Sequence, residues 1–165
     1  MMKAQPGFTL VEMMAVIAVI TILALMAVPS YLDRIIKAQI EAAMPLADLA
    51  KRPIATFWDA TRTFPADNAL AALPAADKIV NNYVSALTVQ DGVINITFGN
   101  RANKAIAGKI ISLRPAIVED APMVPITWVC GLAEAPDKMT VTGTDQTNVD
   151  VLYLPMDCRK LKKQP

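Results

Sequence analysis

The feature that most constrains this chain is an uncharged, apolar stretch near its N-terminus. From Met13 to Leu32, 20 consecutive residues carry no formal charge. A helix rises 1.5 Å per residue, so a helix of this length spans about 30 Å, the thickness of a bilayer's hydrocarbon core. We therefore expect residues 8–32 to form a helix that can cross a membrane.

The seven residues before this stretch do not look like an ordinary secretory signal. Residues 1–7, MMKAQPG, are short and polar and carry one positive charge, Lys3. A secretory signal has its small-residue cleavage site after the apolar core, whereas here the small residue, Gly7, precedes it. The position of Gly7 therefore argues against an ordinary secretory signal.

Glu12 is an unusual residue because it places a carboxylate near the start of an apolar helix. A charged side chain costs up to about 2.5 to 3.5 kcal/mol at the bilayer centre and less near the interface, so it needs a partner. Cleavage after Gly7 would create an α-amino group on Phe8, four residues before Glu12, and this group could pair with it in the same chain or a neighbour. The alternative is an interfacial charge of a simple signal anchor.

Composition argues against an enzyme. The chain has no histidine, which excludes histidine-based triads, bases and metal ligands. Cys130 and Cys158 are the only cysteines, too few for a zinc or iron–sulfur site by themselves, so a disulfide or two buried thiols remain. The 16 basic and 15 acidic residues give no overall field that favours nucleic acid. We expect no cofactor and no metal.

The rest of the pattern predicts an α+β head. Apolar residues recur at spacings of four and three after the span, which is typical of an amphipathic helix, and we expect the N-terminal helix to cover residues 8–58. Pro29 and Pro45 should kink this helix, and Pro53 should mark its last turns. The apolar positions are Ile36, Ile40, Ala43, Ala47 and Ala50.

The head itself should occupy residues 59–165. Residues 59–91 are read as a connecting segment with a short helical turn at 75–82, and residues 92–130 as a sheet. The strand-forming runs are residues 93–98, 109–113 and 123–129, with a weaker run at 138–142. The prolines at 115, 122 and 125 should confine strand ends to edges or loops. We expect an antiparallel sheet of three or four strands packed on the helix.

The string Gly7-Phe8-Thr9-Leu10-Val11-Glu12, followed by an apolar helix with Pro29 and Tyr31, resembles the prepilin signature of type IV pilins. The short leader with Phe8 resembles the type IVa branch in particular. The head shows softer similarities, in residues 83–98, in residues 126–130 and in the approach Tyr153-Leu154-Pro155 to Cys158.

The resemblance implies a pilin fold and a structural role. It implies leader cleavage between Gly7 and Phe8, and methylation of Phe8, by a prepilin peptidase and N-methyltransferase. Glu12 would register an incoming subunit, and a pilus assembly platform would polymerise the chains. The subunit would wait in the inner membrane and end in a surface filament for adhesion, twitching motility or DNA uptake.

In an exported head the two cysteines should form a disulfide that bounds residues 130–158. A pseudopilin of a type II secretion system shares the N-terminus but often replaces this loop, so the cysteine pair favours a pilin. A minor DNA-binding competence pilin is the second alternative, and it would need a basic stripe on the head.

Three further features have simpler readings. The basic residues near the C-terminus could touch phosphates, but without an aromatic platform or recognition helix we expect a solvated tail and keep DNA only as an alternative. They are Arg159, Lys160, Lys162 and Lys163. Met13, Met14 and Met26 are read as helix-packing residues rather than metal ligands. Asn95-Ile96-Thr97 fits a glycosylation sequon but lies in an expected strand, so we discount it.

Overall fold

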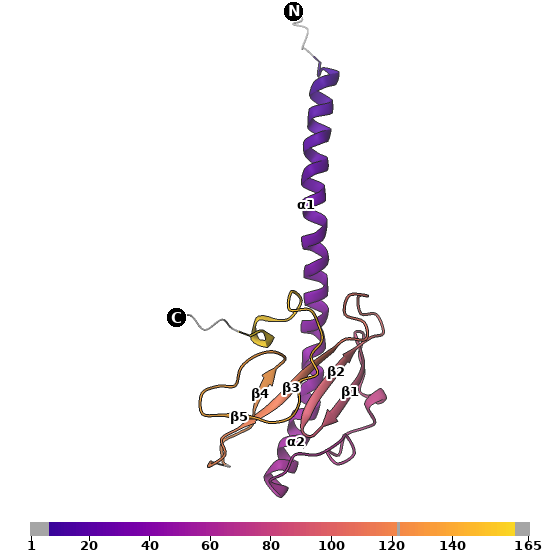
Figure 1. Ribbon diagram of the computed structural model, residues 1–165. Coiled ribbons are helices and arrows are strands. Elements are labelled where there is room, and N and C mark those ends of the chain that lie inside the picture. The colour runs from indigo at the N-terminus through magenta and orange to yellow at the C-terminus, as the bar shows by residue number, and fades with distance from the viewer. Residues whose placement is uncertain (1–6, 122, 161–165) are drawn as a thin grey trace, which may run out of the picture. The chain divides into compact units, whose positions relative to one another are not determined.

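The computed structural model describes residues 7–121 and 123–160 of the chain (Figure 1). The chain divides into two compact units, residues 1–35 and residues 36–165. The first unit is helical, and the second is the head, which combines a helix with a sheet. The expected α+β class is confirmed.

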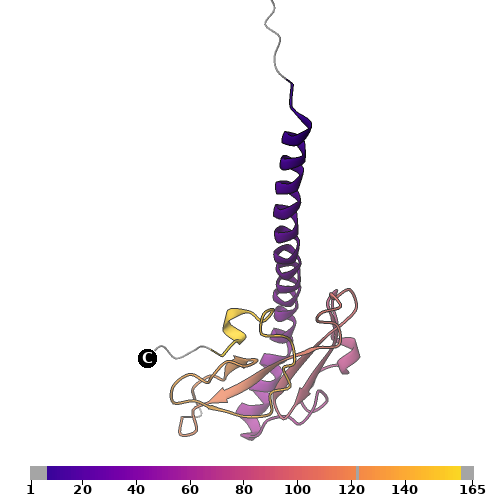
Figure 2. The same ribbon diagram turned by 45° about the horizontal axis from the view of Figure 1, so that its top comes forward.

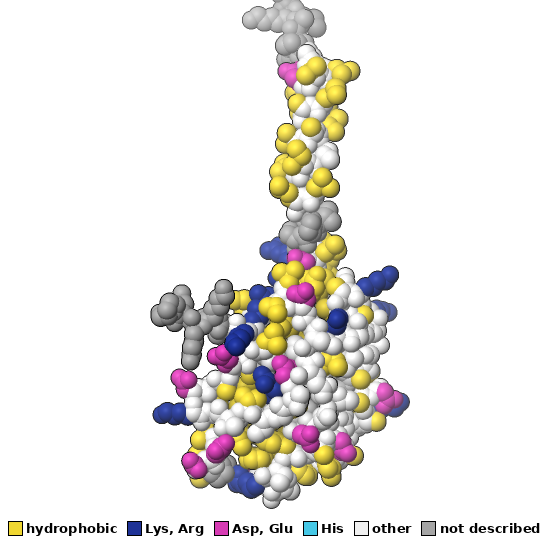
Figure 3. All heavy atoms as spheres, viewed as in Figure 1, with side chains coloured by type: hydrophobic (Ala, Val, Ile, Leu, Met, Phe, Trp, Pro, Cys, Tyr) yellow, Lys and Arg dark blue, Asp and Glu magenta, His cyan; other side chains and the backbone are white. Residues whose placement is uncertain are grey.

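The first unit consists of the greater part of helix α1, which runs from Leu10 to Ala43. Every described side chain from Phe8 to Met26 is exposed. Hydrophobic side chains dominate the visible face of this segment in Figure 3. The helix contains a window with a mean hydropathy of 2.6, which is long and apolar enough to cross a membrane. By itself this is weak evidence of a span, because a signal sequence near an N-terminus has the same composition.

The helical part of the head joins three elements end to end. They are residues 36–43 of α1, the 3-10 turn η1 (Met44–Ala47) and α2 (Asp48–Thr61). One stripe of this helical part is buried, in agreement with the apolar spacing, and Ile54 continues it by one more turn. The stripe consists of Ile36, Ile40, Ala43, Ala47, Ala50 and Ile54, none of which is more than 4% exposed.

The prolines in this part of the chain have different effects. Pro45 lies in η1, where the α-helical pattern gives way to a 3-10 turn. The backbone of α1 stays helical through position 29, and a kink at Pro29 remains a prediction. Pro53 lies inside α2 and begins its last two turns, and the helix ends at Thr61, three residues beyond the expected end at residue 58. Burial of Ala50 and Ile54 on either side holds the helix together despite the donor that Pro53 lacks.

The sheet is antiparallel with the strand order β1-β2-β3-β4, and β5 pairs with β3. The strands are β1 (Val84–Gln90), β2 (Val93–Phe98), β3 (Ile110–Ile117), β4 (Thr127–Cys130) and β5 (Thr140–Val141). Figures 1 and 2 show the helical part of the head against one face of the sheet. Leu87, Ile94, Ile96 and Ile111 of the sheet join the helix stripe in a single hydrophobic core.

The sheet begins earlier than expected, because β1 lies inside the segment that we read as a connection. A bulge between Val84 and Ala86 breaks the alternation of apolar residues, which hid this strand in the sequence. The feature of the sequence that indicates a strand before residue 91 is the turn dipeptide Asp91-Gly92. Both residues have positive φ, 48° and 79°, and they join β1 to β2 in a two-residue hairpin. The short helical turn expected at 75–82 is present as the 3-10 turn η2 (Ala76–Lys78).

Strand β3 runs through Pro115, although we expected it to stop at Leu113. Pairing with β2 ends at Leu113, and pairing with β5 begins at Ala116. Pro115 therefore lies between these two pairings, opposite Trp128 of β4, and its carbonyl accepts a hydrogen bond from the Thr142 N–H at 2.9 Å. Strand β4 begins at Thr127, four residues later than the expected run 123–129, because Pro125 confines the residues before it to a loop. Pro122 lies outside the described residues.

Candidate assembly sites on the helix and the disulfide-bounded loop

Glu12 is held at the start of α1 by Thr9. Its Oε2 accepts hydrogen bonds from the Thr9 N–H and from the Thr9 hydroxyl, both at 2.7 Å. The Glu12 N–H in turn donates to the Thr9 hydroxyl oxygen at 3.3 Å. This reciprocal pair is a capping box, in which a threonine before the helix and a glutamate three residues later satisfy free backbone donors. The motif Thr-x-x-Glu was readable in the sequence, and our sequence analysis missed it.

The capping box leaves the second oxygen of the carboxylate open. Among the described residues, Oε1 of Glu12 accepts no hydrogen bond. Gly7 and Phe8 lie just before the helix, and both are exposed. The arrangement presents one fixed carboxylate, with one free oxygen, beside the expected cleavage point. Met13, Met14 and Met26, also in this segment, are exposed.

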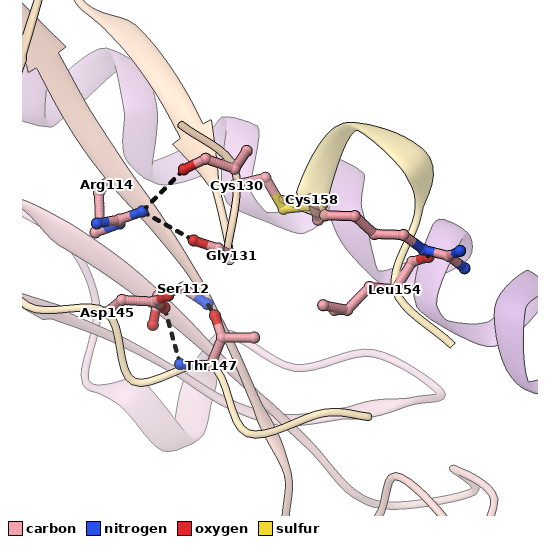
Figure 4. The surroundings of a disulfide bond; sticks show 10 residues. Ser112, Arg114, Cys130, Gly131, Asp145, Thr147, Leu154 and Cys158 are labelled. Atoms are coloured by element: carbon pink, nitrogen blue, oxygen red, sulfur yellow. Dashed lines mark hydrogen bonds between the residues drawn. A yellow bond between two sulfur atoms is a disulfide. The ribbon is translucent and has the colours of Figure 1, made fainter. Parts of the chain in front are cut away.

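The two cysteines form the expected disulfide. Cys130 ends β4, and Cys158 ends the 3-10 turn η3 (Met156–Cys158), with their Cα atoms 4.5 Å apart. The backbone is also tied here, because the Leu132 N–H donates to the Cys158 carbonyl at 2.9 Å. Arg114 of β3 donates to the carbonyl of Gly131 at 2.9 Å and holds the turn that follows β4 (Figure 4).

The loop between the cysteines crosses the face of the sheet opposite the helix, as Figure 1 shows. Three contacts to Ser112 and Ile110 of β3 fix its path. The Gln146 N–H donates to the Ser112 hydroxyl at 2.9 Å, and the Ser112 N–H donates to the Thr147 hydroxyl at 3.0 Å. The Ile110 N–H donates to Oδ1 of Asn148 at 2.6 Å. The loop is therefore part of the folded head over this stretch and not a free flap.

The crossing also encloses Asn95, the first residue of the sequon. Asn95 is 2% exposed, and its Oδ1 accepts a hydrogen bond from the Ser112 hydroxyl at 2.6 Å. A buried and hydrogen-bonded amide is not presented at the surface of the folded head. This position agrees with the expectation that the sequon is not used.

The described part of the basic tail is engaged with the head. Arg159 donates to the carbonyls of Leu154 and Leu152, at 2.8 and 3.0 Å. Nζ of Lys160 lies 3.6 Å from a carboxylate oxygen of Glu134. Lys162 and Lys163 lie outside the described residues, so the solvated tail and the possible basic patch both remain predictions.

Within the residues that the structure describes, no three histidine, cysteine, aspartate or glutamate side chains lie close enough to hold a metal ion. The features that the chain does carry are an apolar helix with one carboxylate near its start and a disulfide-stapled α+β head. They define a class of protein, in which an apolar N-terminal helix is joined to a disulfide-stapled α+β head.

The comparisons with known proteins identify the family within this class. A profile of pilins, the subunits of bacterial filaments, matches residues 36–159, and one of the prokaryotic N-terminal methylation motif matches residues 2–28. The chain belongs to the pilin family and is a structural subunit of a pilus, not an enzyme.

Several relatives are similar over nearly the whole chain. A type IV major pilin protein PilE1 of Neisseria gonorrhoeae is 35% identical over 162 residues, which cover 94% of this chain and 87% of the relative. A fimbrial protein of Neisseria meningitidis serogroup B is 30% identical and covers 94% of each chain. A fimbrial protein of Moraxella nonliquefaciens is 34% identical over 96% of this chain and 99% of the relative.

Proposed function

We propose that this chain is cleaved between Gly7 and Phe8 and polymerises as a type IV pilin, with Glu12 pairing with the Phe8 amine of a neighbouring subunit. The observation that carries the proposal is the geometry of Glu12. It is the only charged residue between Phe8 and Leu32, Thr9 fixes one of its oxygens, and the other is free to accept a cation. An ion pair of this kind is strongest where lipid or packed helices exclude water.

Before assembly, the subunit is held in the inner membrane by residues 8–32. The hydropathy and exposure of this part of α1 support that role. The methylation motif supports processing by a prepilin peptidase and N-methyltransferase, which also methylates Phe8. The pilus assembly platform then moves the helix from the bilayer into the filament, where packed helices replace the lipid.

The relatives favour an abundant surface filament as the destination. Those cited above are called major pilin or fimbrial proteins. Adhesion and twitching motility are the roles that such a filament would serve, and DNA uptake is a further role. A secretion-system pseudopilin and a specialised DNA-binding pilin are not favoured, and the inward position of Arg159 adds nothing to the DNA alternative.

The test uses cells that lack this chain and the same cells complemented with the full-length gene product. We expect surface filaments, seen by electron microscopy, to disappear in the first strain and to return in the second, with the chain abundant in sheared filaments. Normal filaments in its absence would indicate an accessory subunit. Absence of the chain from purified wild-type filaments would contradict the proposal.

A further inference from the structure

One side of the head carries an open groove of about 550 Å³ between α2 and the loop before β4. Lys51, Arg52 and Arg62 bring positive charge to its helical wall, against the single carboxylate of Asp59. The opposite wall is apolar and includes Met123, which is 95% exposed, and Val124. The groove thus offers a cationic side and an apolar side to the same occupant.

Arg52 is the cation in this groove that is free to bind. Lys51 forms an ion pair with Asp48 at 2.8 Å. In the part of the chain that the structure describes, Arg52 is exposed and forms no ion pair. An exposed arginine beside an apolar wall suits a partner segment that carries both a carboxylate and apolar side chains.

The disulfide-bounded loop contains a segment with this chemistry. Residues 130–158 include five acidic residues and one basic residue, Lys138. Within residues 150–157, the exposed side chains are both acidic and apolar. They are Asp150, Val151, Leu152, Met156 and Asp157, and Met156 is 66% exposed. Arg159, which follows, is turned onto backbone carbonyls of the same segment.

Figures 1 and 2 show η3 and the end of α2 toward opposite ends of the head, so the two surfaces cannot meet within one subunit. A contact between two different surfaces of identical subunits is heterologous, and it repeats without closing when the subunits are related by a screw. Such a contact builds a filament. Opposite charge and exposed apolar area on the two surfaces therefore point to a second copy as the occupant.

We propose that residues 150–157 of one subunit dock in the groove of the next, with Asp157 facing Arg52 and Met156 packing near Met123. This inference deepens the proposed function and depends on it, since it names a contact between the head domains of neighbouring subunits in the filament. The contact is small, and it gains strength because every subunit in the filament makes it twice, once with each surface.

The first test reverses charge in full-length chains expressed in cells. We expect Arg52→Glu and Asp157→Arg each to lower the amount of chain in sheared filaments several-fold at an unchanged membrane level. The double variant should recover most of the loss. Lys104→Glu, which makes the same charge change at another exposed position, should leave assembly unchanged. Losses that the double variant fails to recover would overturn the contact.

The second test locates the contact in the filament. We expect filaments of the double variant Met123→Cys and Met156→Cys, treated with a mild oxidant, to give a ladder of multimers on a non-reducing gel. Each single variant, and the control pair Leu70→Cys with Met156→Cys, should stay monomeric. Normal filaments without a ladder would overturn this inference and leave the pilin function standing. Absence of the wild-type chain from filaments would remove both.

Discussion

The Ser112 hydroxyl donates a 2.6 Å hydrogen bond to Oδ1 of Asn95, and the two residues face each other across β3 and β2. Both are buried under the disulfide-bounded loop, and the Gln146 N–H of that loop donates to the same hydroxyl. One serine therefore joins two strands and the loop that covers them. The loop's position on the sheet depends on this polar contact as well as on the disulfide.

Ser112→Ala should destabilise the head by about 1–3 kcal/mol, because it leaves the buried Oδ1 of Asn95 and the half-buried Gln146 N–H without their partner. Urea unfolding of the full chain in detergent would measure the change. Ser85→Ala is the matched control, since the Ser85 hydroxyl makes one longer, half-buried bond to the Thr97 carbonyl at 3.3 Å. Equal losses for the two variants would show that Ser112 has no special role.

Gly143→Ala should displace the loop from the sheet. A Cβ atom at Gly143 would overlap with Cγ2 of Val93, and the residue has a φ of +81°. Gly108→Ala is the control, because Gly108 has a φ of +74° but no atom near the added methyl group. Both variants lose about 1 kcal/mol of folding free energy to backbone strain. The additional loss in Gly143→Ala measures the clash of the added methyl group with Val93. Thermal unfolding would compare them, and identical midpoints would contradict the clash.

Loss of the Cys130–Cys158 disulfide should cost the head about 3.5 kcal/mol, since the bond closes a long loop between residues 28 apart. The paired variant Cys130→Ala, Cys158→Ala, studied by urea unfolding, measures this cost without leaving a free thiol. Alkylation of the unreduced wild-type chain from the cell surface is the control. Quantitative labelling of both thiols there would show that the bond does not form in the native filament.

The mature chain should begin with methylated Phe8. Gly7 is the only small residue at the boundary between the polar leader and the apolar helix, and the methylation motif covers this position. Intact-mass and N-terminal peptide mass spectrometry of purified filaments would identify the first residue. A start beyond Val11 would contradict the proposal, because it would displace or remove Glu12.

Glu12→Gln should strongly reduce entry into filaments while the membrane level stays normal. Glutamine can still complete the capping box with Thr9, so this variant removes the charge and keeps the helix start. Thr9→Ala is the complementary variant, because it removes the cap and keeps the carboxylate, and it should retain more assembly. The measurement compares membrane and sheared-filament levels of each variant. Wild-type assembly of Glu12→Gln would show that Glu12 is an incidental charge.

Local patterns in the sequence were sufficient for the helix and the class of fold. The uncharged run from Met13 to Leu32 and the four–three spacing after it depend only on the period of a helix, so both were readable without neighbours. The capping box was equally local, and so was the Asp91-Gly92 hairpin, although we used neither. The end of α2 lies at Thr61 and not at residue 58, because burial of Ile54 keeps the helix together past Pro53.

Contacts between distant residues decided the rest. The place of β1 in the sheet and the extension of β3 past Pro115 follow from which strand lies beside which. The same holds for the path of the disulfide-bounded loop, where Ser112, Asn95 and Gln146 are far apart in the sequence and meet only when the sheet forms. By itself the sequence determined where the chain is apolar, where it is charged and which residues can pair. Only the tertiary structure decided which of them do, because hydrogen bonds and packing across strands depend on register and burial, which no local pattern specifies.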